Sequence, residues 1–250
     1  MTNNTYIYLT TQTSATDSML RIFTTIQNSS FDDAKYIDKF LSKNSVDALK
    51  DADLPSDGNL HRFNLPTMFD VGKVHDEHKL IINYRDPRDH FCNVYHWRFS
   101  HPVRGESEEQ RELRLSELRK KSVDDFVLEQ ANTKYYENIV KALTELDPKK
   151  FSVLTYARLC LGFDSFISKS ADFLECELTK EIRDNLEVER IDNLSDNPRY
   201  IGNKWAGADV CPGRYKRELK PETINILNQR FEKVLAVMAE HDPDFATYYK

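Results

Sequence analysis

The sequence predicts an α/β protein in which a parallel sheet is flanked by helices on both faces, giving three layers. Short apolar runs recur along the chain, and each of them leads directly into a stretch of helical periodicity. A short, continuous apolar run is typical of a strand that is buried on both faces, as strands of a parallel sheet are. In such sheets ligands bind outside the carboxyl ends of the strands.

Four segments are candidate strands. Residues 6–9 form the first, and the apolar pattern over residues 19–26 predicts the helix that follows it. Residues 80–84 form the clearest strand, and residues 151–154 form a further one. Residues 60–63 are the fourth candidate. Each strand therefore leads toward a helix, as in an open parallel sheet.

The remaining segments differ in character. Residues 106–121 combine mixed charges with only three leucines, which is typical of a solvated helix. Residues 191–217 have no period, and in a compact domain such a long irregular segment is usually functional or mobile. The closing helix begins at Lys220-Pro221-Glu222, where proline suits the first turn. We expect residues 1–250 to form a single domain.

Composition and charge exclude several classes of protein. The net charge of −6 argues against a broad nucleic-acid interface. The four cysteines have no paired spacing, and His75 and His78 lack a third ligand, so we expect reduced thiols and no metal site. The N-terminus lacks the features of a signal peptide, and no segment approaches the ~20 apolar residues of a membrane span. We therefore expect a cytoplasmic protein without a membrane partner.

The segment Thr11 to Ser18 joins the first strand to its helix. In a strand, turn and helix of this kind, backbone N–H groups and the helix dipole point at an anion. The turn is rich in hydroxyl groups but has neither the glycines nor the lysine of a Walker loop. An alternative interpretation is that Thr16, Asp17 or Ser18 only caps the helix.

The segment Tyr84 to Asp89, Y-R-D-P-R-D, follows the clearest strand. It places Arg85 and Arg88 beside the unpaired N–H groups of a helix N-terminus, which favours a phosphate monoester site. The alternative is an ion-paired turn in which both guanidinium groups serve only the fold.

Taken in order, these motifs resemble those of the PAPS-dependent sulfotransferases. Two further stretches extend the resemblance: Tyr156-Ala157-Arg158-Leu159 after the third strand and Gly213-Arg214-Tyr215-Lys216 before the final helix. The resemblance implies the P-loop-like sulfotransferase fold, PAPS as the cofactor and PAP as its product. It also implies transfer of a sulfuryl group to a hydroxyl or amine of a small-molecule or glycan acceptor.

The resemblance further implies roles for individual residues. It places the 5′-phosphosulfate on the first loop, at Thr13, Ser14, Ala15, Thr16, Asp17 and Ser18. It places the 3′-phosphate on Arg85 and Asn93, where the family usually has serine at the second position, and an amide can donate a hydrogen bond as a hydroxyl does. It places Tyr156 near the adenine. For the family's basic clamp the irregular segment offers Arg199, Lys204 and Arg214, although these side chains also fit a solvated basic loop.

Two departures from the family pattern affect catalysis. Thr13 stands where the family usually has a lysine or arginine, which neutralises charge on the bridging oxygen in the transition state. Asn64 stands where many members have a histidine base, and an amide cannot remove a proton. His61 is the nearest replacement base, although three residues along a strand place it on the opposite face.

The departures leave more than one function open. A protein that keeps the fold but only binds PAP or PAPS is the first alternative. An unrelated P-loop-like kinase is the second, but no segment supplies the Walker lysine or an evident Mg²⁺-binding aspartate.

Overall fold

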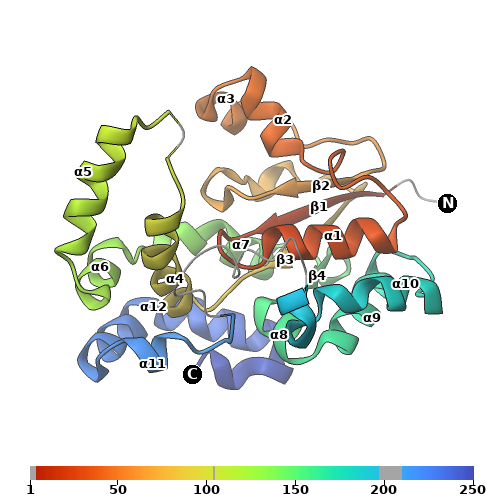
Figure 1. The fold of residues 1–250 in the computed structure, drawn as a ribbon. Coiled ribbons are helices and arrows are strands. Elements are labelled where there is room, and N and C mark those ends of the chain that lie inside the picture. Colours follow the sequence, from red (N-terminus) through yellow and green to blue (C-terminus); the bar gives the residue numbers. More distant parts are fainter. Residues whose placement is uncertain (1–3, 104, 197–209) are drawn as a thin grey trace.

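The computed structural model describes residues 4–103, 105–196 and 210–250. Its centre is a parallel sheet of four strands in the order β2-β1-β3-β4 (Figure 1). The strands are β1 (Thr5–Thr10), β2 (Leu60–Phe63), β3 (His78–Asn83) and β4 (Phe151–Val153). In register, Leu9 of β1 lies between Phe63 and Ile82, and Ile82 pairs with Val153. The carboxyl ends of all four strands therefore meet at one edge.

Both faces of the sheet are buried. Successive residues of a strand point to opposite faces, so Ile7 and Leu9 enter one apolar core while Tyr6 and Tyr8 enter the other. Every residue of β1 is buried as a result. The continuous apolar runs in the sequence follow from this burial.

Helices cover each face of the sheet. On the face of Ile7 pack α4 (Pro87–Ser100), α7 (Glu137–Glu145) and α12 (Pro221–His241). On the face of Tyr6 pack α1 (Thr16–Ile26), α9 (Phe163–Phe173) and α10 (Lys180–Leu186). These layers confirm the predicted α/β fold.

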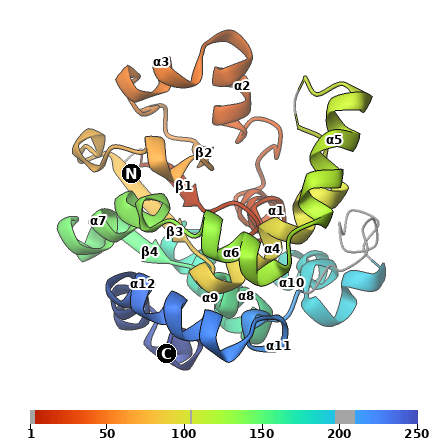
Figure 2. The ribbon, with the colours of Figure 1, turned by 90° about the vertical axis from the view of Figure 1, so that its left-hand side faces the viewer.

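The shorter elements surround this centre. Helices α2 (Tyr36–Lys43) and α3 (Val46–Asp51) lie beyond the β2 edge of the sheet in both views (Figures 1 and 2). The other α-helices are α5 (Glu108–Arg119), α6 (Val123–Gln130), α8 (Tyr156–Leu161) and α11 (Tyr215–Glu218). The 3₁₀ turns are η1 (Pro66–Met68), η2 (Val71–Lys73), η3 (Thr133–Tyr136), η4 (Pro148–Lys150), η5 (Glu187–Glu189), η6 (Ile191–Asp196) and η8 (Pro243–Tyr248).

The predicted elements compare well with this architecture. The candidate strand over residues 60–63 is β2, the mixed-charge segment forms α5, and the closing helix begins at Pro221. Of the segment 191–217, which the sequence predicts to be irregular, residues 191–196 form η6 and α11 begins at Tyr215, while residues 197–209 lie outside the described residues. No helix in the described part of the chain is both long and apolar enough to cross a membrane.

Candidate functional site

The first loop, residues 11–15, joins β1 to α1 at the carboxyl edge of the sheet. Two of its residues have left-handed backbones, Thr13 with φ 59° and Ala15 with φ 56°. This conformation costs a residue with a Cβ about 1–2 kcal/mol, and such strain is concentrated at functional sites. The loop therefore makes the tight turn of a glycine-rich anion cradle without a glycine.

Polar side chains brace the loop from within. The hydroxyl groups of Thr11 and Ser14 hydrogen-bond to each other, and Thr16 Oγ1 donates to the carbonyl of Thr11 at 3.2 Å. From β3, Asn83 Nδ2 donates to the carbonyl of Ser14 at 2.9 Å and to Thr10 Oγ1 at 2.9 Å. These hydroxyl groups fix the shape of the loop.

The capping interpretation of the first turn of α1 is wrong. Ala15 occupies the N-cap, and it has no side-chain oxygen to accept a hydrogen bond. The carboxylate of Asp17 is instead ion-paired with Arg62 of β2. Ser18 Oγ accepts from Arg21 Nη2 at 2.9 Å. The first backbone N–H groups of α1 therefore keep their capacity to bind an anion.

Arg85 lies between β3 and α4, directly behind the first loop. Its side chain is only 2% exposed, and Nη1 donates to the carbonyl of Thr13 at 3.2 Å. Its Cζ atom lies 4.2 Å from the centre of the Tyr156 ring, and its Nε atom lies 3.8 Å from Asp89 Oδ2. Within the described residues, Nε and Nη2 have no hydrogen-bond partner. A buried cation with two such donors is costly unless an anionic acceptor completes it.

Asp89 joins this arginine to a distant segment. Its carboxylate accepts from the backbone N–H of Gly213 at 2.7 Å and of Tyr215 at 2.9 Å. Burial raises the pKa of Asp89, although Arg85 opposes the shift. Gly213 has φ 83°, a conformation that favours glycine. The start of α4 therefore holds the segment that carries Arg214.

Arg214 brings a second guanidinium group to α4. It is 1% exposed, Nη1 donates to Asn93 Oδ1 at 3.1 Å, and Nε donates to Glu218 Oε1 at 2.6 Å. Because Asn93 lies one helical turn after Asp89, Arg214 and Arg85 contact the same side of α4. The structure thus gathers three of the predicted 3′-phosphate residues.

Tyr156 begins α8, immediately after β4 and Thr155. Its hydroxyl donates to the carbonyl of Val210 at 2.7 Å, while its ring contacts the guanidinium of Arg85. Burial raises the pKa of Tyr156 well above its ordinary value, so the hydroxyl stays protonated. Arg199 and Lys204, the other predicted basic residues, lie outside the described residues.

Arg88 is not part of an anion site, contrary to the prediction for the R-D-P-R-D element. Its Nε and Nη2 atoms donate to the two oxygens of Asp86 at 3.0 and 2.6 Å, and Nη1 donates to Asn228 Oδ1 at 2.5 Å. Its Cζ atom lies 4.1 Å from the centre of the Tyr215 ring. The ion-paired alternative therefore describes Arg88, whereas Arg85 Nε and Nη2 have no hydrogen-bond partner among the described residues.

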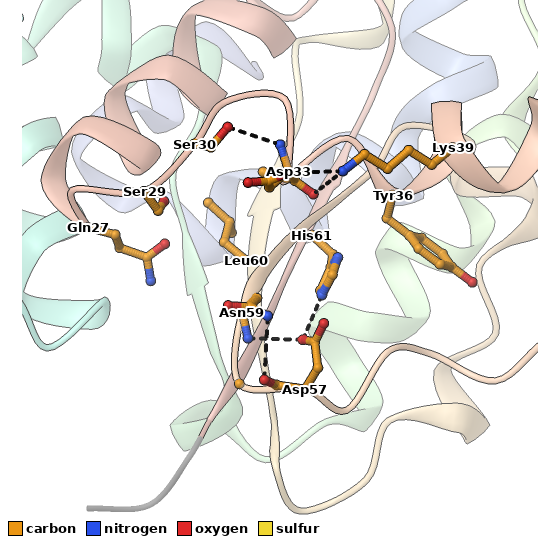
Figure 3. A pocket seen from close by; sticks show the side chains of 12 residues that line it. Gln27, Ser29, Ser30, Asp33, Tyr36, Lys39, Asp57, Asn59, Leu60 and His61 are labelled. Atoms are coloured by element: carbon orange, nitrogen blue, oxygen red, sulfur yellow. Dashed lines mark hydrogen bonds and ion pairs between the residues drawn. The ribbon is translucent and has the colours of Figure 1, made fainter.

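His61 lies away from the first loop. It pairs in register with Ile7 of β1, and its Nε2 atom lies 2.8 Å from Asp57 Oδ1. It lines a pocket of about 550 Å³ together with Gln27 and Ser29, which follow the C-terminal end of α1 (Figure 3). The first loop is at the opposite end of α1. The structure therefore does not bring His61 together with Thr13 or Arg85, because the His61 side chain contacts Asp57 and lines the pocket near the C-terminal end of α1.

Two residues at the loop were not predicted from the sequence. His90 Nδ1 donates to the carbonyl of Gln12 at 2.9 Å, and the Tyr135 hydroxyl accepts from the backbone N–H of Gln12 at 2.9 Å. His90 also lies 3.4 Å from Thr13 Oγ1. The position of His90 in the first turn of α4 was a usable signal, whereas nothing in the sequence connects Tyr135 to the loop.

Comparison with known families decides the identity of the fold. Residues 24–238 match the family model of the sulfotransferase domain. The chain belongs to the sulfotransferase family. The match begins at residue 24, after the first loop, so the family model does not cover residues 11–18 of this sulfotransferase.

Solved structures share the fold of this sulfotransferase. Retinol dehydratase in complex with androsterone and inactive cofactor PAP has a TM-score of 0.60 and 16% identity, covering 94% of this chain and 81% of that chain. The complex of retinol dehydratase with retinol and PAP has a TM-score of 0.62 and 14% identity, covering 94% of this chain and 82% of that chain. Mouse sulfotransferase SULT7A1 complexed with PAP has a TM-score of 0.53 and 14% identity, covering 98% of this chain and 87% of that chain. At such identities the likeness concerns the fold alone. No curated protein sequence matches the chain.

Proposed function

We propose that this sulfotransferase transfers a sulfuryl group from PAPS to a hydroxyl or amine of a small-molecule or glycan acceptor. The observation that carries the proposal is Arg85, a buried cation next to the first loop whose Nε and Nη2 atoms lack partners among the described residues. The three similar structures contain PAP, which supports the same cofactor here.

Arg85, Asn93 and Arg214 would hold the 3′-phosphate. Each guanidinium group already lies near a carboxylate, Asp89 for Arg85 and Glu218 for Arg214, so the two arginines would contribute mainly N–H groups that suit the phosphate oxygens. Asn93 Oδ1 already accepts from Arg214, which leaves the Nδ2 donors of Asn93 for a ligand. Tyr156 would border the adenine, and Arg199 and Lys204 would add positive charge.

The first loop would hold the 5′-phosphosulfate. Backbone N–H groups over residues 13–18 and the positive end of the α1 dipole supply the attraction, and the internal hydroxyl contacts keep them in place. The ion pair with Arg62 offsets the charge of Asp17, which would otherwise oppose an anion. When bound, PAPS supplies the activated sulfuryl group, and PAP is the leaving group.

Among the residues that the structure describes at this edge of the sheet, none is an evident base for the proton of the acceptor. Asn64 follows β2 at the same edge of the sheet but cannot accept a proton as a base. The geometry does not support His61 in this role, because Asp57 holds it in the other pocket. An amine or an acidic phenol would need little help with deprotonation, so these acceptors fit the site best.

Calorimetry with PAP, with ATP as the control, tests the cofactor, and turnover of labelled PAPS tests the reaction. We expect PAP to bind and to raise the thermal stability, because it would bind only the folded state. An unchanged melting temperature at millimolar PAP would remove the cofactor from the proposal.

A PAP- or PAPS-binding module is the second candidate, and Thr13 and Asn64 favour it. Tight PAP binding without turnover of hydroxyl, phenol or amine acceptors would support this alternative. Thr13→Lys separates the two functions further. If Thr13 occupies the family's basic position, the added cation should raise or create turnover while PAP affinity changes only a few-fold.

A further inference from the structure

The backbone of Gln12 is held from outside the first loop by two side chains. His90 of α4 donates Nδ1–H to its carbonyl, and the hydroxyl of Tyr135 in η3 accepts its N–H, each at 2.9 Å. The rings of His90 and Tyr135 stack on each other with centres 4.8 Å apart. The stacked pair therefore contacts the N–H and the C=O of Gln12, which belong to the two peptide units on either side of its Cα. Within the loop, Ser14 Oγ also donates to this carbonyl, at 3.3 Å.

Gln12 immediately precedes the strained residue of the loop. Thr13 has φ 59°, an uncommon backbone for a β-branched residue, and it needs surrounding contacts to persist. The carbonyl of Thr13 accepts from Arg85, so the same turn also touches the cation of the candidate 3′-phosphate site. Because the C=O of Gln12 is in the same peptide unit as the Thr13 nitrogen, contacts that hold the Gln12 backbone limit the rotation of the Thr13 backbone.

We propose that His90 and Tyr135 are positioning residues that clamp Gln12 and thereby hold the anion-binding N–H groups of the first loop in place. The proposal rests on the proposed function only for the identity of the ligand.

The chemistry of His90 suits this task. A carbonyl acceptor requires a proton on Nδ1, so the contact with Gln12 fixes the tautomer. Burial lowers the pKa of His90 to about 3, and the imidazole is therefore neutral at physiological pH. It serves as a fixed donor and does not add charge to the loop.

The neighbouring Tyr136 provides a matched control. It is fully buried, and among the described residues its hydroxyl has no hydrogen-bond partner. Removing this hydroxyl should leave the loop unchanged, whereas removing the hydroxyl of Tyr135 deprives the Gln12 N–H of its acceptor. Tyr135→Phe and Tyr136→Phe make the same chemical change one residue apart.

Hydrogen exchange at the Gln12 amide tests the clamp without any ligand. We expect Tyr135→Phe to speed this exchange about tenfold, the effect of losing one hydrogen bond, and Tyr136→Phe to leave it unchanged. Equal exchange in both variants and the wild type would overturn the proposal.

Two substitutions at His90 test whether its Nδ1–H group holds the Gln12 carbonyl. Both remove the ring, but they place an amide N–H at different positions. Asparagine places an amide N–H near the position of Nδ1, whereas glutamine places it near that of Nε2. We expect His90→Asn to keep PAP affinity within about threefold of the wild type, and His90→Gln to weaken it about tenfold. Equally weak binding in the two variants would mean that the ring acts by packing, which contradicts the clamp. If the wild type binds no PAP, the proposed function fails, and the exchange experiment alone decides the clamp.

Discussion

The two arginines at the start of α4 lie three residues apart and have opposite surroundings. Both are buried, with exposures of 2% for Arg85 and 1% for Arg88. Arg88 donates to Asp86 and Asn228 and stacks on Tyr215, so its charge and donors are used within the fold. In the described structure Arg85 keeps two donors without partners.

The same contrast extends to the backbone around each arginine. Near Arg85, the first loop has left-handed residues at Thr13 and Ala15, whereas α4 begins with Pro87, which suits the first helical turn. Burial alone therefore does not distinguish the arginine proposed to bind a ligand from the arginine whose donors are used within the fold. The distinction comes from the unpartnered donors of Arg85 and the strained backbone of the neighbouring loop. Both cost stability in the absence of a ligand, and a bound anion would offset that cost.

The largest expected effect is the loss of stability in Arg88→Met. This change leaves the carboxylate of Asp86 buried without its partner, and breaking such a pair costs about 3–5 kcal/mol. Urea unfolding should show this loss, with Arg85→Met as the matched control. Arg85→Met should cost clearly less, because it removes fewer contacts. Equal losses in the two variants would abolish the contrast between the two arginines.

The second prediction concerns ligand binding in the same two variants. Arg85→Met should weaken PAP binding by about 2 kcal/mol or more, the scale of a charge-assisted contact. An adenosine nucleotide without a 3′-phosphate should bind the wild type and this variant alike. Calorimetry with both ligands checks the assignment, and an equal loss for the two would place Arg85 away from the 3′-phosphate.

The third prediction uses the pH dependence of stability near the loop. Burial lowers the pKa of His90 from its ordinary 6.5 to about 3. Below pH 6.5 the unfolded chain therefore binds a proton that the folded chain does not, and this term reduces stability as the pH falls. Each pH unit in this window costs up to ~1.4 kcal/mol.

The variant His90→Asn lacks this titration and serves as the reference. Between pH 6.5 and 4.5 the wild type should lose about 2 kcal/mol more unfolding free energy than the variant. Parallel stability curves over this range would show that His90 is protonated in the folded protein.

The sequence predicted the fold because the relevant signals are local. Leu80-Ile81-Ile82 is a continuous apolar run, and Pro87 marks the start of the next helix. Short motifs also suggested Arg85 and Arg214 as candidate site residues, and the structure places both against α4. The sequence did not distinguish Arg88 from Arg85, because Asp86 lies near both arginines in the sequence, and the further partner of Arg88, Asn228, is 140 residues away along the chain.

The contact of Tyr135 with the first loop and the position of His61 also depend on residues that are far apart in the sequence. Tyr135 reaches Gln12 across 123 residues, a contact that no periodicity or motif records. His61 was the nearest histidine in sequence, but the register of β2 with β1 places it toward the far end of α1. The left-handed backbone of Ala15 was also hidden, since an alanine normally indicates an ordinary backbone.

The smallest expected effect comes from the strain at Ala15. Its φ of 56° places its Cβ close to the following carbonyl, and glycine removes that contact. Ala15→Gly should therefore raise the unfolding free energy by about 0.5–1 kcal/mol, after the greater freedom of glycine in the unfolded chain is subtracted. The control is Ala48→Gly in α3, an exposed helical position where the same change should lower stability by about 1 kcal/mol. Urea unfolding of the two variants should thus show changes in unfolding free energy of opposite sign. A destabilised Ala15→Gly would instead mean that the first loop is not strained. The contrast between the first loop and the Arg88 region would then lie in the two arginines alone.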